Sequence, residues 1–136
     1  MISSETKIQV RYDEVDKMGY VYHGNYARYY HISRTDLLRE FGLSDKDLEQ
    51  LQLLLPVIEL NIKYLKPVYY DDIITIQTIL EGLPVSRMKF RHIVYNSDDE
   101  IINKASSTVV FVDSKSRKPM RAPKIIIDKI KLNLSE

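Results

Sequence analysis

The stretch from Asn25 to Gly42 reads NYARYYHISRTDLLREFG and predicts one long helix of about four to five turns. Its larger side chains recur at the three- and four-residue spacing that places them on one face of a helix. Gly42 follows the last of them, and glycine commonly ends a helix. The residues of the predicted buried face are Tyr26, Tyr29, Tyr30, Ser33, Leu37 and Phe41.

Beyond this helix the sequence predicts a short helix and then a sheet. The short helix begins at Ser44, which stands at capping-box spacing from Asp47. From Pro56 onward, apolar and polar residues alternate with the period of two that is typical of a half-buried strand. Short turn-forming links favour antiparallel hairpins between the runs. The predicted strands are Ile58 to Tyr64, Ile73 to Glu81, Met88 to Tyr95 and Ile101 to Val112.

The two ends of the chain have weaker patterns. Ile8 to Tyr12 is a short extended run, and the acids and glycine of Asp13 to Gly19 indicate a turn. Pro119 and Pro123 are expected to break extended pairing. The last apolar segment, Ile125 to Leu134, fits either a helix or a strand.

Composition narrows the class of protein. With 136 residues, we expect a single α+β domain spanning residues 1–136, in which an antiparallel sheet wraps around the long helix. The formal net charge of +1 gives no general attraction to nucleic acid or anionic membranes, and the absence of cysteine excludes disulfides and thiolate chemistry. No signal peptide or bilayer-spanning run is recognised, so we expect a cytoplasmic protein without integral membrane contact.

The candidate site lies immediately before the long helix, where residues 11–26 read RYDEVDKMGYVYHGNY. The first N–H groups of a helix have no partner within the helix, and the helix dipole attracts negative charge to that end. The first turn holds Tyr26, Ala27 and Arg28 and no acid, which leaves this end open to an anion. Acids in a turn are more often solvated or capping residues, so the spacing alone does not assign a function.

The same stretch resembles the signature of the 4-hydroxybenzoyl-CoA thioesterase-like family, particularly its YbgC-type acyl-CoA thioesterases. The resemblance continues through Tyr64 to Pro67 and Asp72 and covers nearly the whole chain. His31 departs from it, because many members have Glu there, and Asp71 departs where Gly is frequent. The matching positions are Arg11, Tyr12, Asp16, Gly19, Val21, Tyr22, His23, Asn25, Tyr26 and Arg34.

This resemblance implies a hotdog fold and hydrolysis of acyl-CoA to free acid and CoA. Asp16 would be the general base or the nucleophile, and the backbone N–H of His23 or Gly24 would hold the oxyanion. His23 and Tyr22 are further candidates for a catalytic role. For the His23 ring this role competes with local packing, and for Tyr22 it competes with core packing, which is the stronger interpretation. Asn25 and Tyr26 are expected to contact the substrate. We expect no metal and no cofactor.

The remaining expectations concern partners. Arg87 and Arg91 are candidates to bind CoA phosphates, although solvated strand positions would look the same. Open sheet edges, together with the family resemblance, predict a homodimer or homotetramer. Two other functions stay open: a non-catalytic acyl-CoA-binding module, and an acyl-thioester hydratase or dehydratase.

Overall fold

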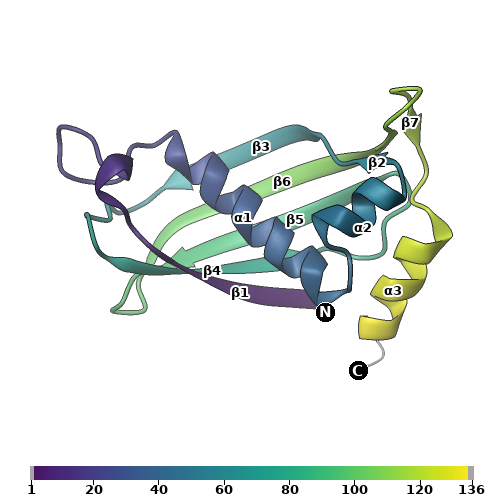
Figure 1. Cartoon of the computed structure of the whole chain (residues 1–136). Coiled ribbons are helices and arrows are strands. Elements are labelled where there is room, and N and C mark those ends of the chain that lie inside the picture. The colour runs from purple at the N-terminus through teal and green to yellow at the C-terminus, as the bar shows by residue number, and fades with distance from the viewer. Residues whose placement is uncertain (1, 135–136) are drawn as a thin grey trace.

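One long helix, α1, lies across the inner face of an antiparallel sheet in the computed structural model, which describes residues 2–134 (Figure 1). Within these residues no helix is long and apolar enough to cross a membrane. The helices are α1 (Asn25–Glu40), α2 (Asp45–Gln50) and α3 (Lys124–Leu134). The strands are β1 (Ile2–Gln9), β2 (Leu53–Leu54), β3 (Val57–Tyr64), β4 (Ile73–Leu80), β5 (Arg87–Tyr95), β6 (Ile101–Asp113) and β7 (Pro119–Met120).

Helix α1 forms where the sequence predicts it and packs on β1 and β4. Its buried face contains the predicted tyrosines and leucine. It also contains Arg34, which the pattern of apolar residues did not predict because the side chain is charged. The helix ends at Glu40, and Gly42, two residues later, has φ +75° and donates its N–H to the carbonyl of Arg39 at 2.9 Å. Gly42 is therefore the stop that this left-handed turn requires.

The sheet has the order β1-β4-β5-β6, with β3 and the short strands β2 and β7 all pairing with β6. Every pairing is antiparallel. On β5, Met88, Phe90 and His92 point inward and are buried, whereas Arg87 and Arg91 alternate with them and are exposed. The predicted antiparallel sheet around one long helix is confirmed.

The first strand differs from the prediction. The sequence favoured an extended run at Ile8 to Tyr12, but β1 spans Ile2–Gln9, and Tyr12–Glu14 form a turn of 3-10 helix. The buried side chains of β1 include Ser4 and Thr6, so this strand has no hydrophobic alternation to detect. The strand is identified by its hydrogen-bonded pairing with β4 and not by a repeat of apolar residues.

The C-terminal region settles one open question and corrects one expectation. Helix α3 occupies the segment that fitted either helix or strand. Its Ile126 and Ile130, four residues apart, are buried in the part of the core that lies at the C-terminal end of α1. Pro119 was expected to break pairing, yet it lies in β7 opposite Val112. This strand has two residues and, in the described part of the chain, pairs with β6 alone, a position at which the missing N–H of proline is tolerated.

Candidate functional site

A tight turn fixes Asp16 in front of α1. The Asp16 N–H donates to the carbonyl of Tyr20 at 3.1 Å, and the Gly19 N–H donates to the carbonyl of Asp16 at 3.0 Å. Gly19 has φ +86°, a conformation that other residues adopt only under strain. Pairing of Val15 with Val21 closes the base of the turn. These contacts therefore hold the Asp16 backbone in place in front of α1.

Within the described residues, one of the two oxygens of the Asp16 carboxylate accepts a hydrogen bond from the protein. Its Oδ1 accepts the N–H of Met18 at 2.9 Å, and within residues 2–134 its Oδ2 has no hydrogen-bond partner. The side chain borders a cavity of about 280 Å³ between the turn, the start of α1 and the end of β3. The other residues that line it are Met18, Tyr20, Val21, His23, Tyr26, Tyr64, Leu65, Lys66 and Pro67.

Unused N–H donors lie just before α1, next to the same cavity, which His23 lines. Gly24 is the N-cap residue, no side chain caps the helix, and its first turn contains no acid. In the described part of the chain, the N–H groups of His23 and Gly24 donate to no other group of the protein. A Cβ on Gly24 would meet a ring carbon of Tyr22 at 2.6 Å. Glycine thus permits the close approach of this exposed ring to the helix start.

Tyr64 reaches the same peptide group from the end of β3. Its hydroxyl donates to the carbonyl oxygen of His23 at 3.0 Å, and its ring meets the edges of His23 and Tyr26. Burial, followed by Tyr22, raises the pKa of Tyr64, so the hydroxyl keeps its proton at neutral pH. The peptide bond that carries the His23 carbonyl also carries the Gly24 N–H, so Tyr64 orients that donor.

Sequence reasoning placed Tyr64 on a strand but gave it no part in the site. Its side chain is 49% exposed although the period of two puts it on the inner face of β3. The sequence offers two signals: an inward-pointing aromatic residue at a strand end, and the family resemblance, which includes Tyr64 but assigns it no role. The contact itself joins residues 41 positions apart, which no local pattern reveals.

The other predicted residues near the turn have distinct positions. Tyr22 is 47% exposed and stacks at a tilt on the His23 ring. Tyr26 is buried, and burial, followed by Tyr64, raises its pKa to about 12. Asn25 donates its side-chain amide to the carbonyl of Glu14 at 2.8 Å, which ties the helix start to the turn. The structure brings all of these residues to one end of α1.

Glu14 differs from the neighbouring acids because it is buried. Its Oε1 accepts the N–H of Arg11 at 2.8 Å and the hydroxyl of Tyr29 at 3.0 Å. These contacts join the 3-10 turn to α1. Asp13, by contrast, is exposed in the same turn. Within residues 2–134, no group of three or more acids and histidines is arranged to hold a metal ion.

The two predicted CoA-binding arginines do not reach this cavity within one chain. Arg87 and Arg91 lie on the outward face of β5, and Arg91 pairs with Glu81 at 2.5 Å. Arg87 begins β5 opposite Val110, whereas Asp16 lies near the opposite end of the sheet, beside Tyr64. The sequence could not reveal this separation, because it follows from the register of the strands.

Comparisons with known proteins identify the family and the fold. The thioesterase-like superfamily matches residues 10–130. YneP of Bacillus subtilis is 35% identical over 92% of this chain and 91% of its own, and the acyl-CoA thioester hydrolase YbgC of Escherichia coli O6:H1 is 30% identical over 91% and 92%. A DHNA-CoA thioesterase structure from Staphylococcus aureus superposes with a TM-score of 0.89 at 29% identity, covering 100% of this chain and 97% of that one. The expected hotdog fold is confirmed, and the chain belongs to the thioesterase-like superfamily.

Proposed function

We propose that this protein hydrolyses acyl-CoA thioesters to a free acid and CoA. One observation carries the proposal: within residues 2–134, Asp16 has a carboxylate oxygen without a partner and shares a cavity with His23, and the N–H groups of His23 and of the adjacent Gly24 are unused. Thioester hydrolysis needs a base or nucleophile beside donors for the oxygen that becomes negative. The named activity of the YbgC relative supports the same reaction.

Two routes use the same groups. As general base, Asp16 would take a proton from water while the resulting hydroxide attacks the thioester carbonyl. As nucleophile, its free Oδ2 would attack the carbonyl directly and form a mixed anhydride that water then hydrolyses. In both routes the N–H groups of His23 and Gly24 stabilise the tetrahedral oxyanion, which collapses by breaking the C–S bond. CoA leaves as a thiolate, so no strong acid is needed.

The neighbouring side chains would position the substrate. The His23 ring is exposed at the cavity and makes no hydrogen bond in the described part of the chain, so it can orient the attacking water. Tyr26 keeps its proton at neutral pH and lines the cavity, where its hydroxyl can contact the thioester. Asn25 acts through Glu14 by holding the helix start, and Tyr22 covers Gly24.

The alternative functions predict different products. A non-catalytic acyl-CoA-binding module would bind the thioester without consuming it. A hydratase or dehydratase would change the acyl chain and leave the C–S bond intact. A free-thiol assay over short, medium, long and aromatic acyl-CoA thioesters separates these cases. Thiol release on any of them favours hydrolysis. Without thiol release, an unchanged thioester favours binding alone, and an altered acyl chain favours a hydratase or dehydratase.

A homodimer or homotetramer would complete the CoA site. Within residues 2–134, strand β3 pairs with β6 and with no other strand, and its Val57 and Ile58 are 43% and 50% exposed. Pairing of two such edges about a twofold axis would place the Tyr64 end of one strand beside the Val57 end of the other. Because Val57 lies opposite Val109 on β6, next to Met88 on β5, this pairing brings the partner's Arg87 toward Asp16.

Tyr64→Phe is expected to lower kcat by roughly three- to tenfold with little change in KM, because one neutral hydrogen bond that orients the oxyanion donor is lost. The phenyl ring keeps its contacts with His23 and Tyr26. Steady-state kinetics on one acyl-CoA measure the effect. Tyr70→Phe is the matched control, since Tyr70 is 52% exposed and its hydroxyl makes no hydrogen bond in the described chain. Equal kcat values for the two variants would remove Tyr64 from the mechanism.

Hydrolysis is expected to continue at an undiminished rate in the presence of a strong chelator. The proposed steps use a carboxylate and backbone donors alone. Thiol release before and after dialysis against the chelator is the measurement. Loss of activity that added zinc restores would contradict the mechanism.

A further inference from the structure

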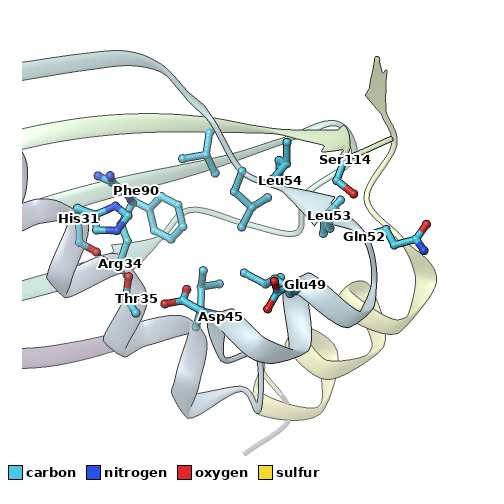
Figure 2. Close-up of a pocket in the computed structure, with 14 residues that line it drawn as sticks. His31, Arg34, Thr35, Asp45, Glu49, Gln52, Leu53, Leu54, Phe90 and Ser114 are labelled. Carbon is cyan, nitrogen blue, oxygen red and sulfur yellow. Dashed lines mark hydrogen bonds between the residues drawn. The ribbon is translucent and has the colours of Figure 1, made fainter. Parts of the chain in front are cut away.

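A second and larger cavity lies beyond the middle of α1, away from the Asp16 turn. Its volume is about 550 Å³, within the range of small-molecule pockets, and α1, α2, β2, β5 and β6 enclose it. Figure 2 shows His31 and Arg34 at one end and Gln52 and Ser114 at the other. Most of its wall is apolar, with contributions from Leu38, Leu53, Leu55, Phe90 and Val109.

Arg34 is an unusual wall residue because it is charged and only 7% exposed. Its one hydrogen bond runs from Nη1 to the hydroxyl of Ser107 at 3.1 Å, and it forms no ion pair within residues 2–134. Burial lowers the pKa of Arg34 to about 10, so the guanidinium still carries its charge at neutral pH. A buried cation without a counter-charge is costly, and most of its donors remain unused.

The groups around Arg34 do not compensate this charge. On α1 the neighbours three and four residues away are Tyr30, His31, Leu37 and Leu38, none of them acidic. From the sheet, the Nε2 of His92 lies 2.9 Å from the Ser107 hydroxyl; burial, followed by Arg34, lowers the pKa of His92 to about 3, so its ring is neutral.

Two acids line the same cavity from α2, but they belong to its rim. Asp45 and Glu49 are exposed, and neither lies within ion-pair distance of Arg34 in the described structure. Water screens exposed carboxylates, so they stabilise a buried cation little. The interior of the cavity therefore combines an apolar wall with one unmatched positive charge.

We infer that this cavity binds an apolar chain that ends in a carboxylate, with Arg34 as the residue that binds the carboxylate. A guanidinium presents paired N–H donors that match two carboxylate oxygens, and such charge-assisted bonds are stronger than bonds between neutral groups. The apolar wall would hold the hydrocarbon part. Two sources supply this chemistry: a free carboxylic acid, or the far end of an acyl group that carries a second carboxylate.

Octanoate is the probe for this site, and isothermal titration calorimetry with the intact protein measures its binding. Octanamide is the control without a charge, and acetate is the control without a long chain. Octanoate is expected to bind at least about tenfold more tightly than either, since octanamide lacks the charge and acetate lacks the chain. Arg34→Met should weaken octanoate by a similar factor and leave octanamide unchanged. Thermal unfolding checks that the variant is folded, which is expected because replacing an unpaired buried charge by an apolar side chain of similar length is often well tolerated.

A second variant tests the place of binding without touching Arg34. Leu54→Trp adds bulk at the lining of the cavity, where Leu54 is 36% exposed, and should abolish octanoate binding. Equal affinity for octanoate and octanamide, no binding of octanoate, or unchanged binding by both variants would each overturn the inference. These titrations involve no thioester, so they are independent of the proposed hydrolysis.

Hydrolysis of two matched thioesters distinguishes the sources. If the ligand is an acyl group with a second carboxylate, the octanedioyl ester of CoA will have a higher kcat/KM than octanoyl-CoA, and Arg34→Met will remove the difference. If the ligand is a free acid, the two esters will react alike while octanoate still binds. Either result supports a carboxylate site at Arg34.

Discussion

Asp16→Asn is expected to slow acyl-CoA hydrolysis by at least about a hundredfold while the protein folds normally, because general-base or nucleophilic catalysis contributes at least that factor. Asparagine preserves the shape of the side chain and can still accept the N–H of Met18 through its amide oxygen. It cannot take a proton from water or attack a carbonyl. Thiol release measures the rate, and thermal unfolding verifies that the turn is intact.

Asp13→Asn is the matched control for this experiment. Asp13 lies three residues away and is exposed, so its replacement should change the rate by less than about twofold. Glu14 is a poorer control, because its carboxylate accepts hydrogen bonds from Arg11 and Tyr29 and a loss there would mix stability with catalysis. Near-normal turnover by Asp16→Asn, or an equal loss in both variants, would show that the catalytic carboxylate lies elsewhere.

Much of this fold could be predicted because its main elements repeat apolar residues at the period of their structure. Helix α1 and strands β3 to β5 follow this rule, whereas the buried residues of β6 include Asn103, Ser107 and Thr108. Strand β1 does not, since its buried face includes Ser4 and Thr6, and the Thr6 hydroxyl is satisfied by Asp36 of α1 at 2.7 Å. A buried polar residue with a distant partner is invisible to a local pattern.

The candidate site divides in the same way. The turn with Asp16 and the helix start are adjacent in sequence, so the sequence alone could place them together. The contact of Tyr64 with His23 and the burial of Arg34 beside Ser107 could not be predicted, because they depend on how β3 and β6 pack relative to α1. The single-domain boundaries, the cytoplasmic location and the tetrameric state stay predictions.

Ile58→Asp is expected to convert the protein to monomers and to reduce hydrolysis by at least about tenfold. Ile58 is 50% exposed on the free edge strand β3, so a carboxylate there should not unfold a single chain. If two β3 edges meet, the same carboxylate loses water on association, which costs several kcal/mol. Sedimentation measures the mass. Val85→Asp is the control, because Val85 is 63% exposed outside β3 and should change neither mass nor rate.

Mixed dimers test whether the two chains share each site. A chain with Asp16→Asn and a chain with Arg87→Glu, purified together through different tags, would form dimers with one intact site and one doubly altered site. Such dimers should recover about half of the normal rate per dimer, although each variant alone is nearly inactive. This follows if Asp16 of one chain works with Arg87 of its partner. Mixed dimers that form but stay inactive, or an active monomeric Ile58→Asp variant, would contradict the shared site. CoA would then be bound by a single chain.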